Sequence, residues 1–141
     1  MRIGLASLYA NPLHSGHLDY LEAAKAASDF LVVIVNNDLQ VALKGSAFMD
    51  EISRLRIIAA LKCVDVAVLS IDTGKSVVKS IEYLRAELGE FQLTLFNSGD
   101  RVPGNQDSEE SNFCRANEIG EVFLDLPKIE SSSRLRNLRL V

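Results

Sequence analysis

The stretch FLVVIV, from Phe30 to Val35, is apolar at every position and rich in β-branched residues. A strand with one face in water alternates apolar and polar side chains, whereas a strand covered on both faces does not. The stretch therefore predicts a strand of a parallel sheet that is covered on both faces. Because parallel strands are joined by crossover connections, helices are expected before and after it in the sequence.

Further β-branched runs and stretches of helical periodicity surround this strand and alternate along the chain. The expected strands are residues 3–9, 30–35, 64–70, 93–96 and 122–126, and the expected helices lie around residues 18–27, 50–61, 77–88 and 113–119, followed by a short final helix. This order predicts a single doubly wound, Rossmann-like α/β domain over residues 1–141, with a five-stranded, mainly parallel sheet flanked by helices. In such a fold the ligand binds beyond the carboxyl ends of the strands.

Composition and charge narrow the class of protein. The chain has 141 residues, of which 48% are apolar and 24% charged, so it suits one folded domain and not a disordered chain. A net charge of −4 offers no broad basic surface for nucleic acid. The apolar runs are too short to cross a membrane, and the first residues lack the pattern of a secretory signal, so a cytoplasmic location is expected. Cys63 and Cys114 are expected to be free thiols.

The loop after the first expected strand has the sequence NPLHSGH, from Asn11 to His17, and carries both histidines of the chain. Their three-residue spacing places His14 and His17 on one face of a helix start. Gly16 removes a side chain where a ligand can approach, and the helix start presents N–H groups with a partial positive charge. Together these features predict an anion site suited to phosphates. The alternatives are polar residues that only begin a helix, and a zinc site that also recruits a cysteine.

With this motif the chain resembles the cytidylyltransferase-like superfamily of nucleotidyltransferases, which share a strand, a turn and the sequence H/T-x-G-H. Within this superfamily it resembles glycerol-3-phosphate cytidylyltransferase and the nucleotidyl-transfer domain of heptose phosphate enzymes. Further matches follow in the family's order: VNND at 35–38, LKG at 43–45, SRLRIIAALKCVD at 53–65, NSGDR at 97–101 and SSSRLR at 131–136. The resemblance covers nearly the whole chain.

The resemblance implies which residues hold the substrates. His14 and His17 would donate to the α- and β-phosphate oxygens of a nucleoside triphosphate, and Lys44 and Arg54 would also contact phosphates. The remaining expected nucleotide-binding residues come from the first loop and from two later segments: Leu8, Tyr9, Asn11, Gly16, Gly99, Asp100, Ser131, Ser132 and Ser133.

Simpler roles compete at several of these positions. Lys44 would be a solvated loop lysine, and Arg54 would pair with a carboxylate on the surface of its own helix. The Gly-Asp pair at 99–100 would form a plain turn, and the serines at 131–133 would cap a helix.

The chain also departs from the family pattern. The family usually has Gly-x-Phe-Asp before the histidines, where this chain has Leu8, Tyr9, Ala10 and Asn11. Both the glycine and the acid are absent, and Glu130 stands where an isoleucine is expected before the serines. Loss of the acid removes a negative charge near the metal and the phosphates, which would lower metal affinity or rate.

The resemblance implies transfer of a nucleoside monophosphate from CTP or ATP to a small phosphorylated acceptor, with release of pyrophosphate. The acceptor phosphate is its own nucleophile, because a second pKa of about 6 leaves it largely dianionic at pH 7. Mg²⁺ is the cofactor expected from polyphosphate chemistry, with no protein metal ligand expected, and the resemblance implies a homodimer. The competing functions are a nucleotide-binding module without turnover and a redox or flavin-carrying domain of similar architecture.

Overall fold

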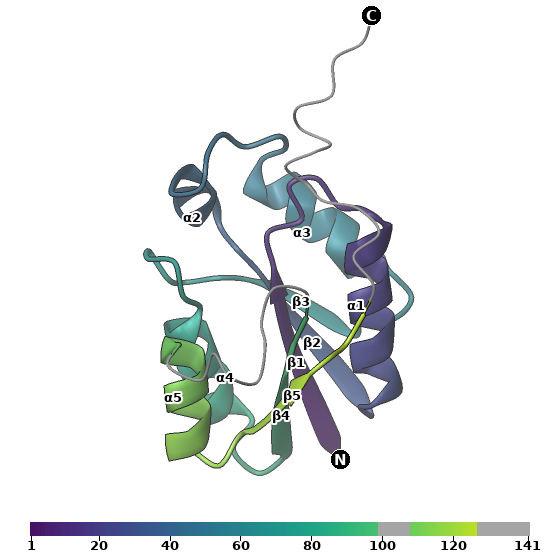
Figure 1. The fold of residues 1–141 in the computed structure, drawn as a ribbon, viewed down its shortest axis with the longest axis vertical. Coiled ribbons are helices and arrows are strands. Elements are labelled where there is room, and N and C mark those ends of the chain that lie inside the picture. Colours follow the sequence, from purple (N-terminus) through teal and green to yellow (C-terminus); the bar gives the residue numbers. More distant parts are fainter. Residues whose placement is uncertain (99–107, 127–141) are drawn as a thin grey trace, which may run out of the picture.

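The computed structural model describes residues 1–98 and 108–126, which form a parallel sheet between two layers of helices (Figure 1). The elements are β1 (Arg2–Leu8), α1 (Ser15–Ala26), β2 (Phe30–Val35), α2 (Asp38–Ala42), α3 (Glu51–Ala59), β3 (Val66–Leu69), α4 (Val78–Glu87), β4 (Gln92–Asn97), α5 (Glu109–Ala116) and β5 (Gly120–Phe123). The sheet has the order β3-β2-β1-β4-β5, and each pairing between neighbours is parallel. The predicted doubly wound α/β fold is confirmed, and the described sheet is wholly parallel where a mainly parallel one was expected.

Alternation along β1 divides the core into two halves. Ala6 and Leu8 face α1 and α3, whereas Ile3 and Leu5 face α4 and α5. Apart from half-buried Phe30, every residue of FLVVIV in β2 is buried, as expected for a strand covered on both faces. The helices of the two halves lie on opposite sides of the sheet (Figure 1).

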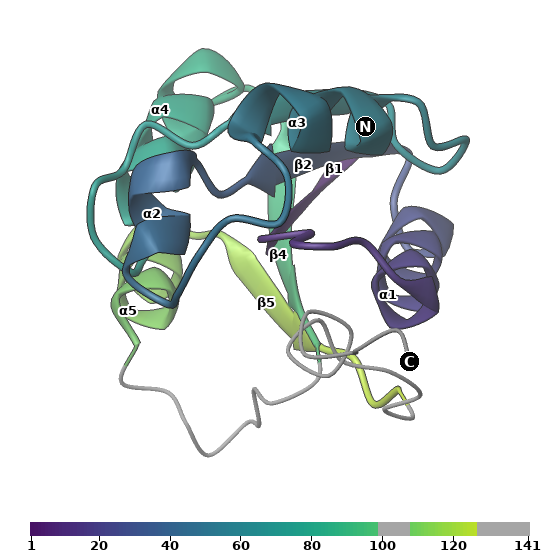
Figure 2. The same ribbon diagram turned by 90° about the horizontal axis from the view of Figure 1, so that it is seen from above.

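The direction of winding reverses beside β1. The chain passes from β1 through β2 to β3 on one side, and then returns through α4 to β4 on the other side of β1. Loops leaving β1 and β4 therefore diverge at their carboxyl ends, which is where ligands bind in open α/β sheets. The view in Figure 2 shows this reversal, with β2 and β4 on either side of β1.

Two local differences from the sequence expectations have clear causes. Helix α2 was not expected, because its five residues have no apolar periodicity; a capping box between Asn37 and Gln40 stabilises it. Helix α5 was expected to stop at Gly120 but ends at Ala116. Glu118, with φ of 58°, takes the left-handed conformation after the helix, and Gly120 begins β5.

The two cysteines are free thiols, as predicted, with Cys114 buried and Cys63 half-buried. No helix formed by residues 1–98 or 108–126 has the length and apolar character needed to cross a membrane. The short helix expected at the end of the chain lies outside the described residues.

Candidate functional site

The two histidines of the NPLHSGH loop form a reciprocal cap at the start of α1. His14 is the N-cap residue, and its Nδ1 accepts a hydrogen bond from the Gly16 N–H at 3.1 Å. In return the backbone N–H of His14 donates to Nδ1 of His17 at 3.2 Å. The two rings stack with their centroids 3.8 Å apart. The structure thus brings the predicted pair together as one unit.

This cap determines which ring nitrogens carry protons. A neutral imidazole has one donor and one acceptor nitrogen, and in both rings Nδ1 is the acceptor. Nε2 is therefore the N–H donor in each ring when it is neutral. Burial, and next the neighbouring His14, lower the pKa of His17 to about 4. At pH 7 His17 is a neutral donor held in a fixed tautomer.

The start of α1 is less open than the sequence suggested. The N–H of Gly16 is bonded to the His14 ring, and the N–H of His17 is bonded to the His14 carbonyl at 3.0 Å. These two N–H groups are already used inside the protein, contrary to the expectation of unpaired donors there. Any anion bound here would depend mainly on the imidazole N–H groups and on the positive end of the helix.

Lys44 lies over the residue that follows β1. Its Nζ is 4.1 Å from the centroid of the Tyr9 ring, within the range of a cation–π contact. Burial, and then the charge of Glu110 on α5, raise the pKa of Tyr9. Tyr9 therefore interacts with a cation from the α2–α3 connection and with an anion from α5. The exposed Lys44 is held by an aromatic ring, and its contact with a phosphate stays a prediction.

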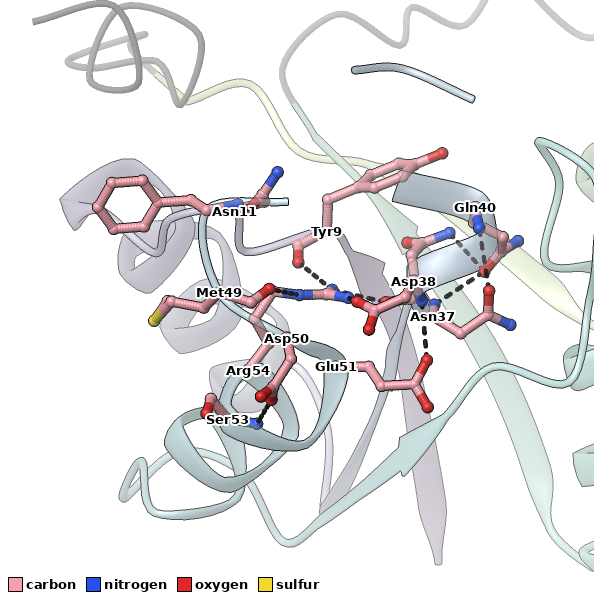
Figure 3. A network of polar contacts seen from close by, with 12 residues as sticks. Tyr9, Asn11, Asn37, Asp38, Gln40, Met49, Asp50, Glu51, Ser53 and Arg54 are labelled. Carbon is pink, nitrogen blue, oxygen red and sulfur yellow. Dashed lines mark hydrogen bonds and ion pairs between the residues drawn. The ribbon is translucent and has the colours of Figure 1, made fainter. Parts of the chain in front are cut away.

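Arg54 is fully buried and supports the loops around the site (Figure 3). Its Nη1 donates to the carbonyl oxygens of Tyr9 at 2.8 Å and Asn36 at 2.6 Å, and its Nε donates to that of Met49 at 3.1 Å. Its ion pair is with Asp38 on α2, at 2.8 Å, so the alternative of a carboxylate on its own helix is wrong. As placed, the guanidinium joins backbone segments, and its predicted phosphate contact is untested.

Leu8 and Asn11, two more predicted nucleotide-binding residues, are also buried. The Leu8 side chain packs in the core beneath α1, and its carbonyl accepts the Asn36 N–H at 3.1 Å. The Asn11 carboxamide bonds to the backbone of the α2–α3 connection. Both residues therefore shape the scaffold under the site.

Sequence reasoning missed a buried polar network at the carboxyl ends of β2 and β3. The Asn37 amide donates to the carbonyls of Ser70 at 2.9 Å and Asp72 at 2.8 Å. The Asp72 carboxylate accepts the backbone N–H groups of Lys79 at 2.8 Å and Ser80 at 3.0 Å, at the start of α4. The polar residues directly after the two strands could have indicated such a network. Their hydrogen-bond partners could not be predicted, because they come from loops that are distant in the sequence.

A cavity of about 350 Å³ opens beside this network. It lies between the β3–α4 connection and the start of α5, and it is lined by Asp72, Thr73, Gly74, Lys75, Ser76, Val78, Lys79, Glu109 and Glu110. Glu110 lines this cavity, and its charge also raises the pKa of Tyr9, the residue that follows β1.

Several predicted residues lie outside the described parts of the chain: Gly99, Asp100, Glu130, Ser131, Ser132 and Ser133. Within residues 1–98 and 108–126, no group of three or more histidine, cysteine or carboxylate side chains could hold a metal ion. The described part therefore does not contain the alternative zinc site of two histidines and a cysteine.

Comparison with known proteins was made for sequence and for fold. Residues 10–102 match the family model described as cytidylyltransferase-like. A segment of 57 residues, 40% of the chain, is 51% identical to the FAD synthase of Methanothrix thermoacetophila. A match of 122 residues, 74% of the chain, is 34% identical to the bifunctional protein HldE of Rhodopseudomonas palustris. These matches span 40% and 25% of the relatives' own lengths.

Solved structures share the fold over most of the chain. A lipopolysaccharide core biosynthesis protein from Thermoplasma volcanium superposes with a TM-score of 0.65 at 25% identity, covering 88% of this chain and 95% of that one. A nicotinate-nucleotide adenylyltransferase described as putative, from Vibrio parahaemolyticus, superposes with a TM-score of 0.64 at 11% identity, covering 96% and 78%. The second likeness concerns the fold alone.

Proposed function

Because the chain belongs to the cytidylyltransferase-like family, we propose that it is a nucleotidyltransferase that moves a nucleoside monophosphate from CTP or ATP to a small phosphorylated acceptor. The observation that carries this proposal is the paired cap of His14 and His17. It sets two Nε2–H donors side by side at the start of a helix, next to the point where the sheet reverses its winding. Donors of this kind suit the oxygens of a triphosphate.

The reaction needs little from the protein beyond position and charge. A phosphate oxygen of the acceptor forms a bond to the α-phosphorus, while the bond from that phosphorus to the bridging oxygen breaks and pyrophosphate leaves. The acceptor phosphate is already largely dianionic, so no side chain has to remove a proton. The imidazole donors would stabilise the charge that grows on the transferred and leaving oxygens. Because the cap already fixes both rings, they need no reorganisation when the reaction occurs.

Charge at the phosphates would come from Lys44 and from the triphosphate's own counterion. Lys44 is exposed, and its Nζ lies 4.1 Å from the ring centroid of Tyr9, the residue that follows β1. We propose that Mg²⁺ is bound mainly by the phosphates of the nucleotide, because Mg²⁺ in such sites is usually held by substrate phosphates and only one or two carboxylates. The predicted nucleotide contacts of Gly99, Asp100, Ser131, Ser132 and Ser133 belong to the same proposal.

The relatives' names and the cavity support a proposal for the acceptor class. FAD is a dinucleotide of flavin mononucleotide and adenosine monophosphate, so an FAD synthase adenylylates a flavin phosphate, which places ATP and a flavin phosphate among the substrates to test here. The lipopolysaccharide core biosynthesis protein acts in building a saccharide, so we propose sugar phosphates as a second acceptor class. The 350 Å³ cavity between the β3–α4 connection and the start of α5 is the proposed place for the part of the acceptor away from its phosphate.

A second candidate function is a nucleotide-binding module without turnover. It is favoured by one observation, the absence of the family's glycine and acid at Leu8 to Asn11. We further propose a homodimer in the cytoplasm, which sedimentation of the purified protein and fractionation of cells would test.

The discriminating experiment measures pyrophosphate release. Each of the four nucleoside triphosphates is offered with Mg²⁺ and one acceptor at a time from a panel of flavin mononucleotide, glycerol 3-phosphate and sugar 1-phosphates. Release that requires one triphosphate and one acceptor supports the enzyme and identifies both substrates. Nucleotide binding without release for any acceptor supports the module, and no binding of any triphosphate rejects both candidates.

A further inference from the structure

Asn11 replaces the acid that the family usually has before its histidines, and its carboxamide is fully engaged by one loop. The residue is only 4% exposed. Its Nδ2 donates to the carbonyl of Ser46 at 3.1 Å, and its Oδ1 accepts the backbone N–H of Phe48 at 2.5 Å. Both ends of the side chain therefore bind the connection between α2 and α3.

This pair of contacts requires an amide. An amide offers a donor and an acceptor at once, whereas an ionised carboxylate offers acceptors only. An aspartate at position 11 would keep the bond to the Phe48 N–H, but it would turn a carboxylate oxygen toward the Ser46 carbonyl. Two acceptors facing each other in a buried place repel and leave a hydrogen bond unmade. The asparagine is thus matched to the loop, and the family's acid is not.

Arg54 holds the next residue of the same loop. Its Nε donates to the carbonyl of Met49, and its Nη1 donates to the carbonyl of Tyr9, at the exit of β1 (Figure 3). Residues 46–49 are therefore tied through their backbone to the segment that leads into the histidine motif. Side-chain packing adds little at Phe48, whose side chain is 60% exposed.

Gly45 separates Lys44 from the tied segment, and the Lys44 Nζ lies 4.1 Å from the Tyr9 ring centroid. On the other side, the Lys44 N–H donates to the Val41 carbonyl of α2 at 2.9 Å. Lys44 therefore lies between the end of α2 and a loop whose backbone is bonded at 46, 48 and 49, and loss of those bonds would release one of its two sides.

We propose that Asn11 and Arg54 are positioning residues that lock residues 46–49 against the exit of β1 and thereby aim Lys44 at the triphosphate. The asparagine at the position of the family's acid thus fixes the conformation of residues 46–49, and its presence does not mean that the site has lost its function. The part about Lys44 and the triphosphate rests on the proposed function, and the lock itself does not.

The lock is tested without substrate by amide hydrogen exchange at Phe48. Loss of its acceptor predicts that the Phe48 N–H exchanges faster by about tenfold or more in Asn11→Ala. Asn11→Asp keeps an acceptor for this N–H, so its exchange should change less. Asn112→Ala and Asn112→Asp are the matched controls, because they make the same two changes at an exposed position on α5. Unchanged exchange at Phe48 in Asn11→Ala would overturn the lock.

Its effect on the site is tested by steady-state kinetics on the same variants. We expect Asn11→Asp to raise KM for the triphosphate about tenfold with a smaller change in kcat, whereas Asn112→Asp matches the unmodified protein. If residue 11 were a weakened form of the family's acid, Asn11→Asp would instead raise kcat/KM or lower the Mg²⁺ requirement. Either of those results, or faster exchange with an unchanged KM, would overturn the positioning role.

A second pair of variants covers the case in which Asn11 variants do not fold. Phe48→Pro removes the backbone N–H that donates to the Asn11 Oδ1, whereas Phe48→Ala keeps it. Both substitutions replace the same exposed side chain. The lock predicts a raised KM in Phe48→Pro only, and equal KM values in the two would contradict it. If the unmodified protein shows no transferase activity, the proposed function fails while the exchange experiment still decides the lock.

Discussion

The two imidazoles at the start of α1 serve the helix and the proposed ligand through different nitrogens. In each ring Nδ1 accepts a backbone N–H, and this fixes the proton on Nε2. The spacing of His14 and His17 in the sequence indicated that the rings would share a face. It did not indicate that they would cap each other, because serine, threonine, aspartate and asparagine are the usual N-cap residues.

The double role of His14 can be separated by substitution. Asparagine is a strong N-cap residue but lacks the Nε2–H donor. We expect His14→Asn to keep the stability of the protein while raising the activation free energy by about 2 to 4 kcal/mol. His14→Ala should show the same loss of rate together with a loss of about 1 kcal/mol of stability.

Turnover by pyrophosphate release and unfolding in urea measure the two effects. An active His14→Asn variant would remove the proposed donor role, whatever its stability.

The lowered pKa of His17 predicts how stability depends on pH. In the unfolded chain the ring has a pKa of about 6.5, whereas in the folded protein it is about 4. Between these values the unfolded chain binds the proton more tightly, so stability is present above pH 6.5 and is lost as the pH falls toward 4. A shift of this size corresponds to roughly 3 kcal/mol, and less where solvent reaches the ring.

Glutamine at position 17 offers a suitable control, since it is a preferred capping-box residue that does not titrate. Urea unfolding of His17→Gln should show a shallower dependence on pH between 4 and 6.5 than the unmodified protein. Equal slopes would show that His17 is not the titrating group.

At the scale of elements, the carboxyl ends of β2 and β3 are organised by side chains that cap neighbouring helices. Asp72 lies before α4 in the sequence. The N-cap residue of this helix is Val77, whose side chain makes no capping hydrogen bond. The Asp72 carboxylate instead reaches the N–H groups of Lys79 and Ser80. Single-sequence reasoning places caps directly before a helix, so this contact across the connection could not be read from the sequence.

Removal of this carboxylate should destabilise the start of α4. We expect Asp72→Ala to lower the free energy of unfolding by about 2 to 3 kcal/mol, because buried backbone donors lose a charged acceptor. Asp72→Asn keeps one acceptor and should cost less. Exposed Asp125 provides the control, and Asp125→Asn should leave urea unfolding unchanged. A loss as small as that of the control would show that Asp72 does not support α4.

Arg54 illustrates the limit of sequence reasoning at this scale. Its place in the family pattern marked it as important, and its helix α3 was expected from apolar periodicity and from Asp50, whose Oδ1 accepts the Ser53 N–H as an N-cap. The pattern did not show that the side chain turns inward to three carbonyl oxygens. Those partners lie on three separate segments, and only the folded chain brings them together.

For the whole molecule, the order of strands and helices was predictable because the alternation of apolar runs with helical periodicity is strong. The ends of elements were less so: β3 is shorter than its apolar run, and β5 begins at Gly120, earlier than expected. The switch point beside β1 follows from the topology, and it places the histidine loop at the edge where ligands bind.

Binding of a triphosphate should stabilise the whole fold. Ligand at 100 times its dissociation constant adds about 2.7 kcal/mol, which corresponds to a rise in Tm on the order of 10 °C for a chain of this size. We expect the shift with ATP or CTP, and a much smaller one with the matching nucleoside, which lacks phosphates. Equal shifts with nucleotide and nucleoside would place the binding energy away from the histidines.

Binding of the triphosphate through Nε2 of the paired histidines can be seen in a crystal structure of the protein with a non-hydrolysable analogue of its preferred triphosphate. We expect Nε2 of both His14 and His17 within about 3 Å of phosphate oxygens, with the Nδ1 caps still in place. Phosphates bound elsewhere, with both Nε2 atoms directed away from them, would contradict it.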